Sequence, residues 1–164
     1  MVGTWGITAC GASTPITNKP RGFRSPSPPP DGARGAASPA LIETVDLYPT
    51  LSELAGLPIP AGLDGQSFSG VIADPTMPAR DFVTHVSPRG GRLGRAIRTE
   101  RYRMVEWKKP GDARDTAEIE LYDYQSDPLE TKNIAATAPE TVAMLRAKLD
   151  AQPEAKPQWR RRNN

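Results

Sequence analysis

The chain has 164 residues with 21 basic and 19 acidic side chains, so its formal net charge is only +2. This balance excludes the strongly basic class of nucleic-acid-binding proteins, and the sequence has no apolar run of about 18 residues that would predict a membrane span. The 18 prolines and 14 glycines leave few residues for a core, and the apolar residues gather after position 40. We therefore expect one small folded unit, with neither nucleic acid nor a membrane as its partner.

The two ends of the chain differ in composition from its middle. Residues 1–38 are rich in proline, glycine and serine, so we expect a disordered arm that cannot bury enough apolar surface to offset the entropy of ordering. The arm does not begin with basic residues followed by an apolar stretch, so no signal peptide is predicted. Residues 152–164 end in Trp-Arg-Arg-Arg-Asn-Asn, which predicts a basic, flexible tail. The folded part is expected over residues 39–151.

A helix is predicted over residues 47–55. Asp46 precedes it as an N-cap, and Pro49 falls in the first turn, where a missing N–H group costs nothing. Gly56 is expected to end the helix in the left-handed conformation. One face of this helix is apolar, and we expect it to face a partner; its residues are Leu47, Leu51 and Leu54.

Alternating residues further along the chain predict a small antiparallel sheet. Its strands are expected near residues 81–87, 94–99, 102–108 and 118–123, with a tight turn at residues 98–101. A C-terminal helix is predicted from Pro139 to Ala151, with an apolar stripe that covers one face of the sheet; the stripe comprises Val142, Leu145 and Leu149. The predicted fold class is therefore α+β: a four-stranded antiparallel sheet with a C-terminal helix, preceded by a separate helix and a disordered arm.

Three ordered segments resemble one protein family. Residues 44–58 read T-V-D-L-Y-P-T-L-S-E-L-A-G-L-P, residues 96–107 read A-I-R-T-E-R-Y-R-M-V-E-W, and residues 120–135 read E-L-Y-D-Y-Q-S-D-P-L-E-T-K-N-I-A. Together they resemble the late part of the sulfatases, particularly the iduronate-2-sulfatase-like branch, over about residues 38–150. The resemblance implies a small C-terminal subdomain that packs on a large α/β catalytic domain and does not carry the catalytic centre.

The resemblance also says what this chain lacks. Sulfatases cleave sulfate esters with a formylglycine made from the Cys or Ser of C/S-x-P-x-R and with a calcium ion held by acidic side chains. Cys10 stands in C-G-A-S-T, without the proline and the arginine of that motif. We therefore expect a truncated sulfatase fragment that binds no cofactor of its own and is inactive. The alternative is a small non-enzymatic interaction module that uses its basic tail.

Residues 1–31 resemble a sulfatase segment when their codons are read in a shifted frame. The sulfatase family carries a block similar to D-H-G-W-H-L-G-E-H-G-M-W-G-K-H-T-N-F-E-E-A-T-R before the V-D-L-Y-P segment. When the last base of each codon is read with the first two bases of the next, residues 1–31 permit G-W-H-L-G-D-H-G-M-W-G-K-H-T-N-Y-E-Q-A-T-R. The hypothesis is a frame-shifted active-site segment, with the frame restored between Asp31 and Ser38. The alternative is an unrelated low-complexity arm.

Two side chains remain as candidates for the rim of a substrate cleft. His85 is the only histidine, and it lies in a predicted strand, where a structural or surface role competes with a catalytic one. Arg89 begins a predicted loop that also contains Arg92 and Arg95. The loop could border a cleft for a sulfated sugar; the alternative is an ordinary solvated loop. A third group, Asp123, Asp127 and Glu130, resembles a metal cluster only superficially; its Ser-Asp-Pro is typical of a turn.

Overall fold

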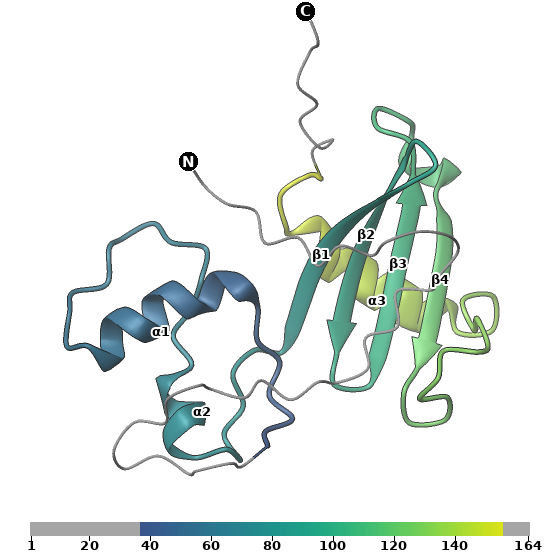
Figure 1. Cartoon of the computed structure of the whole chain (residues 1–164). Coiled ribbons are helices and arrows are strands. Elements are labelled where there is room, and N and C mark those ends of the chain that lie inside the picture. Colours follow the sequence, from purple (N-terminus) through teal and green to yellow (C-terminus); the bar gives the residue numbers. More distant parts are fainter. Residues whose placement is uncertain (1–36, 156–164) are drawn as a thin grey trace, which may run out of the picture.

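The computed structural model describes residues 37–155 (Figure 1). The predictions for the arm, the shifted frame, Cys10 and the end of the basic tail fall on residues outside this range. The elements, in chain order, are η1 (Thr44–Asp46), α1 (Leu47–Leu54), α2 (Ser69–Ala73), β1 (Phe82–Arg89), β2 (Arg92–Thr99), β3 (Tyr102–Lys108), η2 (Arg114–Thr116), β4 (Glu118–Asp123) and α3 (Pro139–Asp150). Within residues 37–155, no helix is long and apolar enough to cross a membrane.

The four strands form one antiparallel sheet in the order β1-β2-β3-β4, so each strand pairs with its neighbour in sequence. This confirms the predicted fold class. The β1–β2 hairpin turns at Gly90 and Gly91, whose φ angles of 56° and 79° fit a two-residue turn that matches the twist of the strands. The β2–β3 hairpin turns at Glu100 and Arg101, as the sequence predicts.

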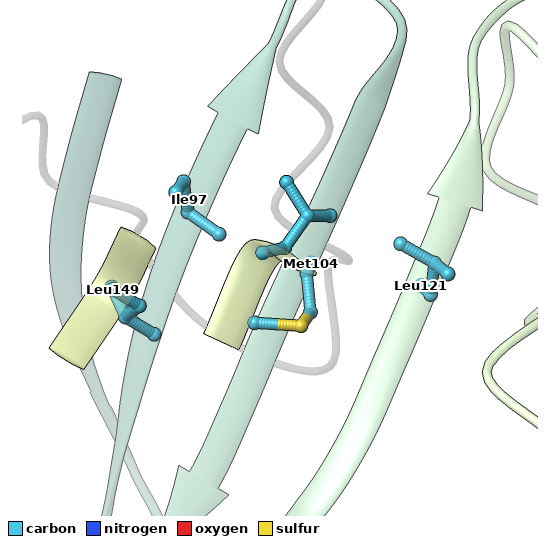
Figure 2. Packing of buried hydrophobic residues seen from close by; sticks show 5 residues of the cluster. Ile97, Met104, Leu121 and Leu149 are labelled. Carbon is cyan, nitrogen blue, oxygen red and sulfur yellow. The ribbon is translucent and has the colours of Figure 1, made fainter. Parts of the chain in front are cut away.

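Helix α3 covers one face of the sheet, as expected (Figure 1). Figure 2 shows Ile97, Met104 and Leu121 of three neighbouring strands together with Leu149 of α3. These side chains and Leu145 form the main core, and none is more than 2% exposed. Val142 packs against this core, so the predicted stripe of α3 is confirmed. The backbone carbonyl of Leu149, near the end of α3, accepts a hydrogen bond of 2.6 Å from Arg95.

Arg95 falls under two competing expectations, the glycine-rich loop and the predicted strand over residues 94–99. The structure places it in β2, 6% exposed, so the strand is confirmed and the loop is wrong; β1 and β2 both extend further toward the turn than predicted. Its side chain points to the α3 side of the sheet because it alternates with Ala96. A guanidinium at a helix C-terminus is favourable, since the last carbonyl groups carry partial negative charge.

Helix α1 buries its polar side and exposes its apolar side. Thr50 is 1% exposed and Ser52 is 7% exposed, whereas Leu51 is 64% exposed and Leu54 is 46% exposed. The exposed apolar surface continues through the loop that follows; we call the whole set the α1 apolar surface, and it comprises Val45, Tyr48, Leu51, Leu54, Leu57, Ile59 and Leu63. Gly56 ends the helix with a φ of 66°, and the N–H group of Leu57 bonds the carbonyl of Ser52, as predicted for a left-handed end.

The prediction that Asp46 caps α1 is wrong. The chain is already helical in η1, so Asp46 has helical backbone angles (φ −76°, ψ −16°) and makes no side-chain cap bond to α1. Its carboxylate instead accepts hydrogen bonds of 2.8 Å from the N–H groups of Glu43 and Gln66 and a bond of 2.9 Å from Nε of Arg80. Glu43 in turn accepts from the N–H of Thr84 in β1. These polar bonds attach the α1 segment to the sheet.

Candidate functional site

Both rim candidates lie on the face of the sheet that points away from α3, here called the outer face. Because side chains alternate along a strand, the register assigns to it His85 and Arg89 of β1, Ala96 and Arg98 of β2, Arg103, Val105 and Trp107 of β3, and Tyr122 of β4. His85 is opposite Ala96, and Arg98 is directly opposite Arg103. Arg92, directly opposite Arg89, lies on the same face, so the sheet brings together five basic or imidazole groups on one surface.

The outer face is more buried than the sequence predicts. The alternation in residues 102–108 favours one covered face and one mixed, exposed face, but Ala96, Val105 and Trp107 are 1%, 0% and 4% exposed and form a second apolar cluster. Trp107 lies against Gly94, where a Cβ atom would come within 2.6 Å of the indole ring. A glycine inside a strand often marks such a close approach, so Gly94 is the sequence signal from which this contact could have been predicted.

The surroundings of His85 favour its neutral form. Burial lowers its pKa below the ordinary value, the positive charge of Arg103 lowers it further, and Glu43 only partly opposes the two. Its Nε2 atom is buried and has no hydrogen-bond partner in the described part of the chain. General acid–base catalysis requires an oriented partner and a proton acceptor or donor within reach. The geometry around His85 provides neither among residues 37–155.

Arg89 lies at the exposed end of β1. Its guanidinium stands 5.6 Å from the centre of the Trp107 ring, a cation–π distance. Four residues of extended chain separate Arg89 from His85, which corresponds to about 13 Å. The two rim candidates therefore share a face of the sheet without forming one site.

A buried polar cluster that the sequence did not reveal lies at the other end of the outer face. Arg103 forms an ion pair with Glu130 in which both side chains are 3% exposed. Glu130 also accepts a hydrogen bond from the hydroxyl group of Tyr124, and the guanidinium of Arg98 stacks 4.8 Å from the centre of the Tyr124 ring. Burial and the neighbouring Glu130 raise the pKa of Tyr124. Glu130 has a φ of 57°, which is uncommon for a residue other than glycine.

The acidic residues at the end of β4 and in the turns after it belong to separate networks. Asp123 pairs with Arg101 at 2.8 Å, Asp127 accepts from the N–H group of Lys132 at 2.8 Å, and Glu130 pairs with Arg103. Over residues 37–155, no group of three or more histidine, cysteine, aspartate or glutamate side chains is arranged to hold a metal ion. These networks stabilise the turns of residues 123–135, which the Ser-Asp-Pro sequence predicts.

Comparisons with curated proteins find similarity to arylsulfatase K from several species. The arylsulfatase K of Rattus norvegicus is 30% identical over 114 residues, which make up 65% of this chain and 20% of that protein. The chain thus spans about a fifth of the length of the curated relatives it matches.

Solved structures share the fold at lower identity. The yidJ protein of Bacteroides fragilis matches with a TM-score of 0.60 at 23% identity, covering 70% of this chain and 25% of that one. A second structure was solved with its substrate, D-glucosamine-2-N,6-O-disulfate; it matches with a TM-score of 0.54 at 22% identity, covering 65% of this chain and 22% of the other.

The match to a family model covers most of the chain. The family is described as "N-sulphoglucosamine sulphohydrolase, C-terminal", and its model matches residues 27–155, which include α1, the sheet and α3. The chain belongs to the C-terminal domain family of N-sulphoglucosamine sulphohydrolase.

Proposed function

We propose that this chain is the C-terminal subdomain of a sulfatase that hydrolyses sulfate esters of sulfated sugars, and that the subdomain does not catalyse the reaction by itself. The observation that carries the proposal is the family match over residues 27–155. In this proposal the sugars are of the glycosaminoglycan type, which is supported by the resemblance of the three sequence segments to the iduronate-2-sulfatase-like branch. The structure solved with a disulfated glucosamine supports a sugar as the substrate.

The described residues support the proposal that catalysis requires a second part. Sulfate ester hydrolysis in this family needs a formylglycine nucleophile and a calcium ion, which stabilises charge that develops on the sulfate. The surroundings of His85 favour its neutral form and leave Nε2 without a partner among these residues, and the acidic residues at the end of β4 and after it are engaged in separate ion pairs and turns. Neither group has the composition of a calcium cage, which needs six to eight oxygen ligands. We propose that both cofactors belong to the catalytic α/β domain of the parent enzyme.

The α1 apolar surface is the proposed contact with that catalytic domain. Seven large apolar side chains between residues 45 and 63 are at least 39% exposed, while the polar side of α1 is buried. A contiguous apolar surface of this kind is typical of a protein–protein or interdomain contact. In this proposal α1 packs on the catalytic domain through Leu51 and its neighbours and on its own subdomain through Thr50 and Asp46.

The gene provides the decisive experiment. If residues 1–31 are a frame-shifted segment, inserting or deleting bases between the codons for Asp31 and Ser38 should restore one open reading frame. The repaired frame should join the D-H-G-W-H-L-G block to A-L-I-E-T-V-D-L-Y-P. The repaired full-length protein should hydrolyse sulfated sugars in a calcium-dependent way, whereas the purified 164-residue chain should hydrolyse neither these nor aryl sulfates. A stop codon in the shifted frame would end the frameshift hypothesis, and activity of the 164-residue chain alone would overturn the non-catalytic role.

A further inference from the structure

The two edges of the sheet differ in how their backbone groups are used. Figure 1 shows β1 and β4 at opposite edges, and each edge strand turns the N–H and C=O groups of every second residue away from the sheet. An edge of this kind can pair with a strand of another chain unless something covers or interrupts it. The contacts along the two strands therefore decide where this protein can add a strand.

The edge of β4 is covered by the chain that follows it. The N–H group of Leu121 donates to the side chain of Asn133 at 3.0 Å, and the carbonyl group of Leu121 accepts from the N–H group of Ile134 at 2.8 Å. Asn133 also donates to the carbonyl group of Ile119 at 3.1 Å. These bonds occupy outward-facing groups in the middle of β4, so a further strand cannot pair there.

The β1–β2 turn fixes which residues face outward on β1. A two-residue turn makes Arg89 and Arg92, on either side of it, a hydrogen-bonded pair, so every second residue before Arg89 bonds to β2. The N–H group of Thr84 agrees with this pattern, because it donates to Glu43 and not to β2. The outward-facing residues of β1 are Phe82, Thr84, Val86 and Pro88.

Two features interrupt this edge, one on each side of Val86. The carboxylate of Glu43 accepts hydrogen bonds of 2.6 Å from the N–H group of Thr84 and of 3.3 Å from its hydroxyl group, in the place where a neighbouring strand would present a carbonyl group. Pro88 has no N–H group to donate, which is why proline within sheets is found mainly on edge strands. Between them, the backbone groups of Val86 have no outward partner within residues 37–155, and Val86 is 49% exposed.

We propose that Glu43 and Pro88 keep the β1 edge closed to a second copy of this chain, and that β1 pairs with the β1 of that copy when both are removed. With both in place, an incoming strand finds a free N–H donor at Val86 but none at either neighbouring outward position. Without them, donors at positions 84, 86 and 88 follow one another, and two antiparallel copies of β1 offer these groups to each other about a twofold axis. The proposal does not depend on the sulfatase role of the parent protein.

Hydrogen exchange of the full chain, followed by NMR, tests the edge directly, because the Val86 N–H group reports on β1 and not on the α1 apolar surface. In Glu43→Ala combined with Pro88→Thr, called the open-edge variant, raising the protein concentration should slow exchange at Val86 at least about tenfold. Sedimentation velocity should show a dimer of this variant. Exchange at Val86 in the wild type should not depend on concentration. The matched control, Glu118→Ala combined with Pro110→Thr, changes an exposed glutamate and an exposed proline away from this edge and should behave as the wild type.

Further variants separate an opened edge from misfolding. Glu43→Gln keeps an acceptor for Thr84, so in combination with Pro88→Thr it should retain wild-type exchange. Val86→Pro, added to the open-edge variant, removes the central donor and should restore the monomer. Glu43→Asp keeps the charge beside Arg80 but shortens the side chain, and it replaces Glu43→Ala if that variant does not fold. Exchange at Val86 that is independent of concentration in the folded open-edge variant, or slowed to the same extent in the wild type, would overturn the proposal.

Discussion

Arg103 and Glu130 form an ion pair from which water is almost completely excluded, with 3% of each side chain exposed. The pair joins β3 to the turn after β4, across 27 residues of sequence. On the same sheet face, Arg92 and Glu118 form a second pair that is 41% and 61% exposed. The protein therefore contains a buried ion pair and an exposed one on a single surface, which allows their energies to be compared.

Breaking the buried pair should cost far more than breaking the exposed one. Glu130→Ala leaves Arg103 as an unpaired buried charge, and we expect the free energy of unfolding to fall by about 3–5 kcal/mol. Glu118→Ala should change it by less than about 1 kcal/mol. Urea unfolding of both variants measures the difference. Equal effects of the two substitutions would show that the Arg103 charge is stabilised by something other than Glu130.

The Asp46 carboxylate should make stability depend on acidic pH. Burial alone would raise its pKa, but hydrogen bonds from Arg80 and from the N–H groups of Gln66 and Glu43 hold the pKa below the ordinary value of 3.8. Because the folded pKa is lowered, the stabilisation is complete above about pH 5 and is lost as the pH falls through the folded pKa. Asp46→Asn should therefore destabilise the protein at pH 7 by about 3 kcal/mol and by much less near pH 3.

Urea unfolding from pH 3 to pH 7 measures this dependence. Asp112→Asn, which changes an exposed aspartate in the β3–β4 connection, serves as the control and should leave the profile unchanged. A difference between wild type and Asp46→Asn that stayed constant down to pH 3 would contradict the lowered pKa.

Adding one methyl group at Gly94 should disturb the outer face. A Cβ atom there would lie 2.6 Å from the Trp107 ring, so the indole has to move, and overpacking of this kind costs about 1–3 kcal/mol. Gly70→Ala in α2 is the matched control, since its Cβ would meet Met77 only at 3.5 Å, an ordinary contact distance. Thermal unfolding and Trp107 fluorescence check both. An unchanged emission maximum in Gly94→Ala would show that the ring does not rest on this glycine.

Helix α3 offers a test of the main core at two adjacent positions. Leu145 is 0% exposed, whereas Met144 is 48% exposed. Leu145→Ala should lower the free energy of unfolding by about 2–5 kcal/mol because it leaves a cavity between the helix and the sheet. Met144→Ala should have little effect, since alanine is the better helix former and little is buried. Similar losses at both positions would mean that α3 is not held by its predicted stripe.

Short-range patterns in the sequence predicted most of the fold, because alternation and helical spacing depend on neighbouring residues. β3 and β4 begin and end at the predicted residues, and α3 ends one residue earlier than expected. Asp46 was misjudged because the same carboxylate that suits a cap also suits Arg80, which is 34 residues away. No local pattern distinguishes these two uses.

The candidate site was harder to predict because its contacts join residues that are far apart in the sequence. His85 lies in a strand as predicted, whereas Arg89 ends that strand instead of beginning a loop. The ion pair of Arg103 with Glu130 depends on a turn that folds back over β4. Arg95 was assigned to a loop as well as to the predicted strand over residues 94–99, because the glycines beside it resemble turn residues. Gly94 in fact lies within β2 and accommodates Trp107.

The strand order β1-β2-β3-β4 has a consequence for how the chain acquires its structure. Every pairing closes a short connection between consecutive strands, so little chain entropy is lost before each new contact forms. Topologies rich in such local contacts fold quickly. The sheet should therefore assemble early and on its own, while the segment that carries α1, which is attached through the distant pair Asp46 and Arg80, joins afterwards.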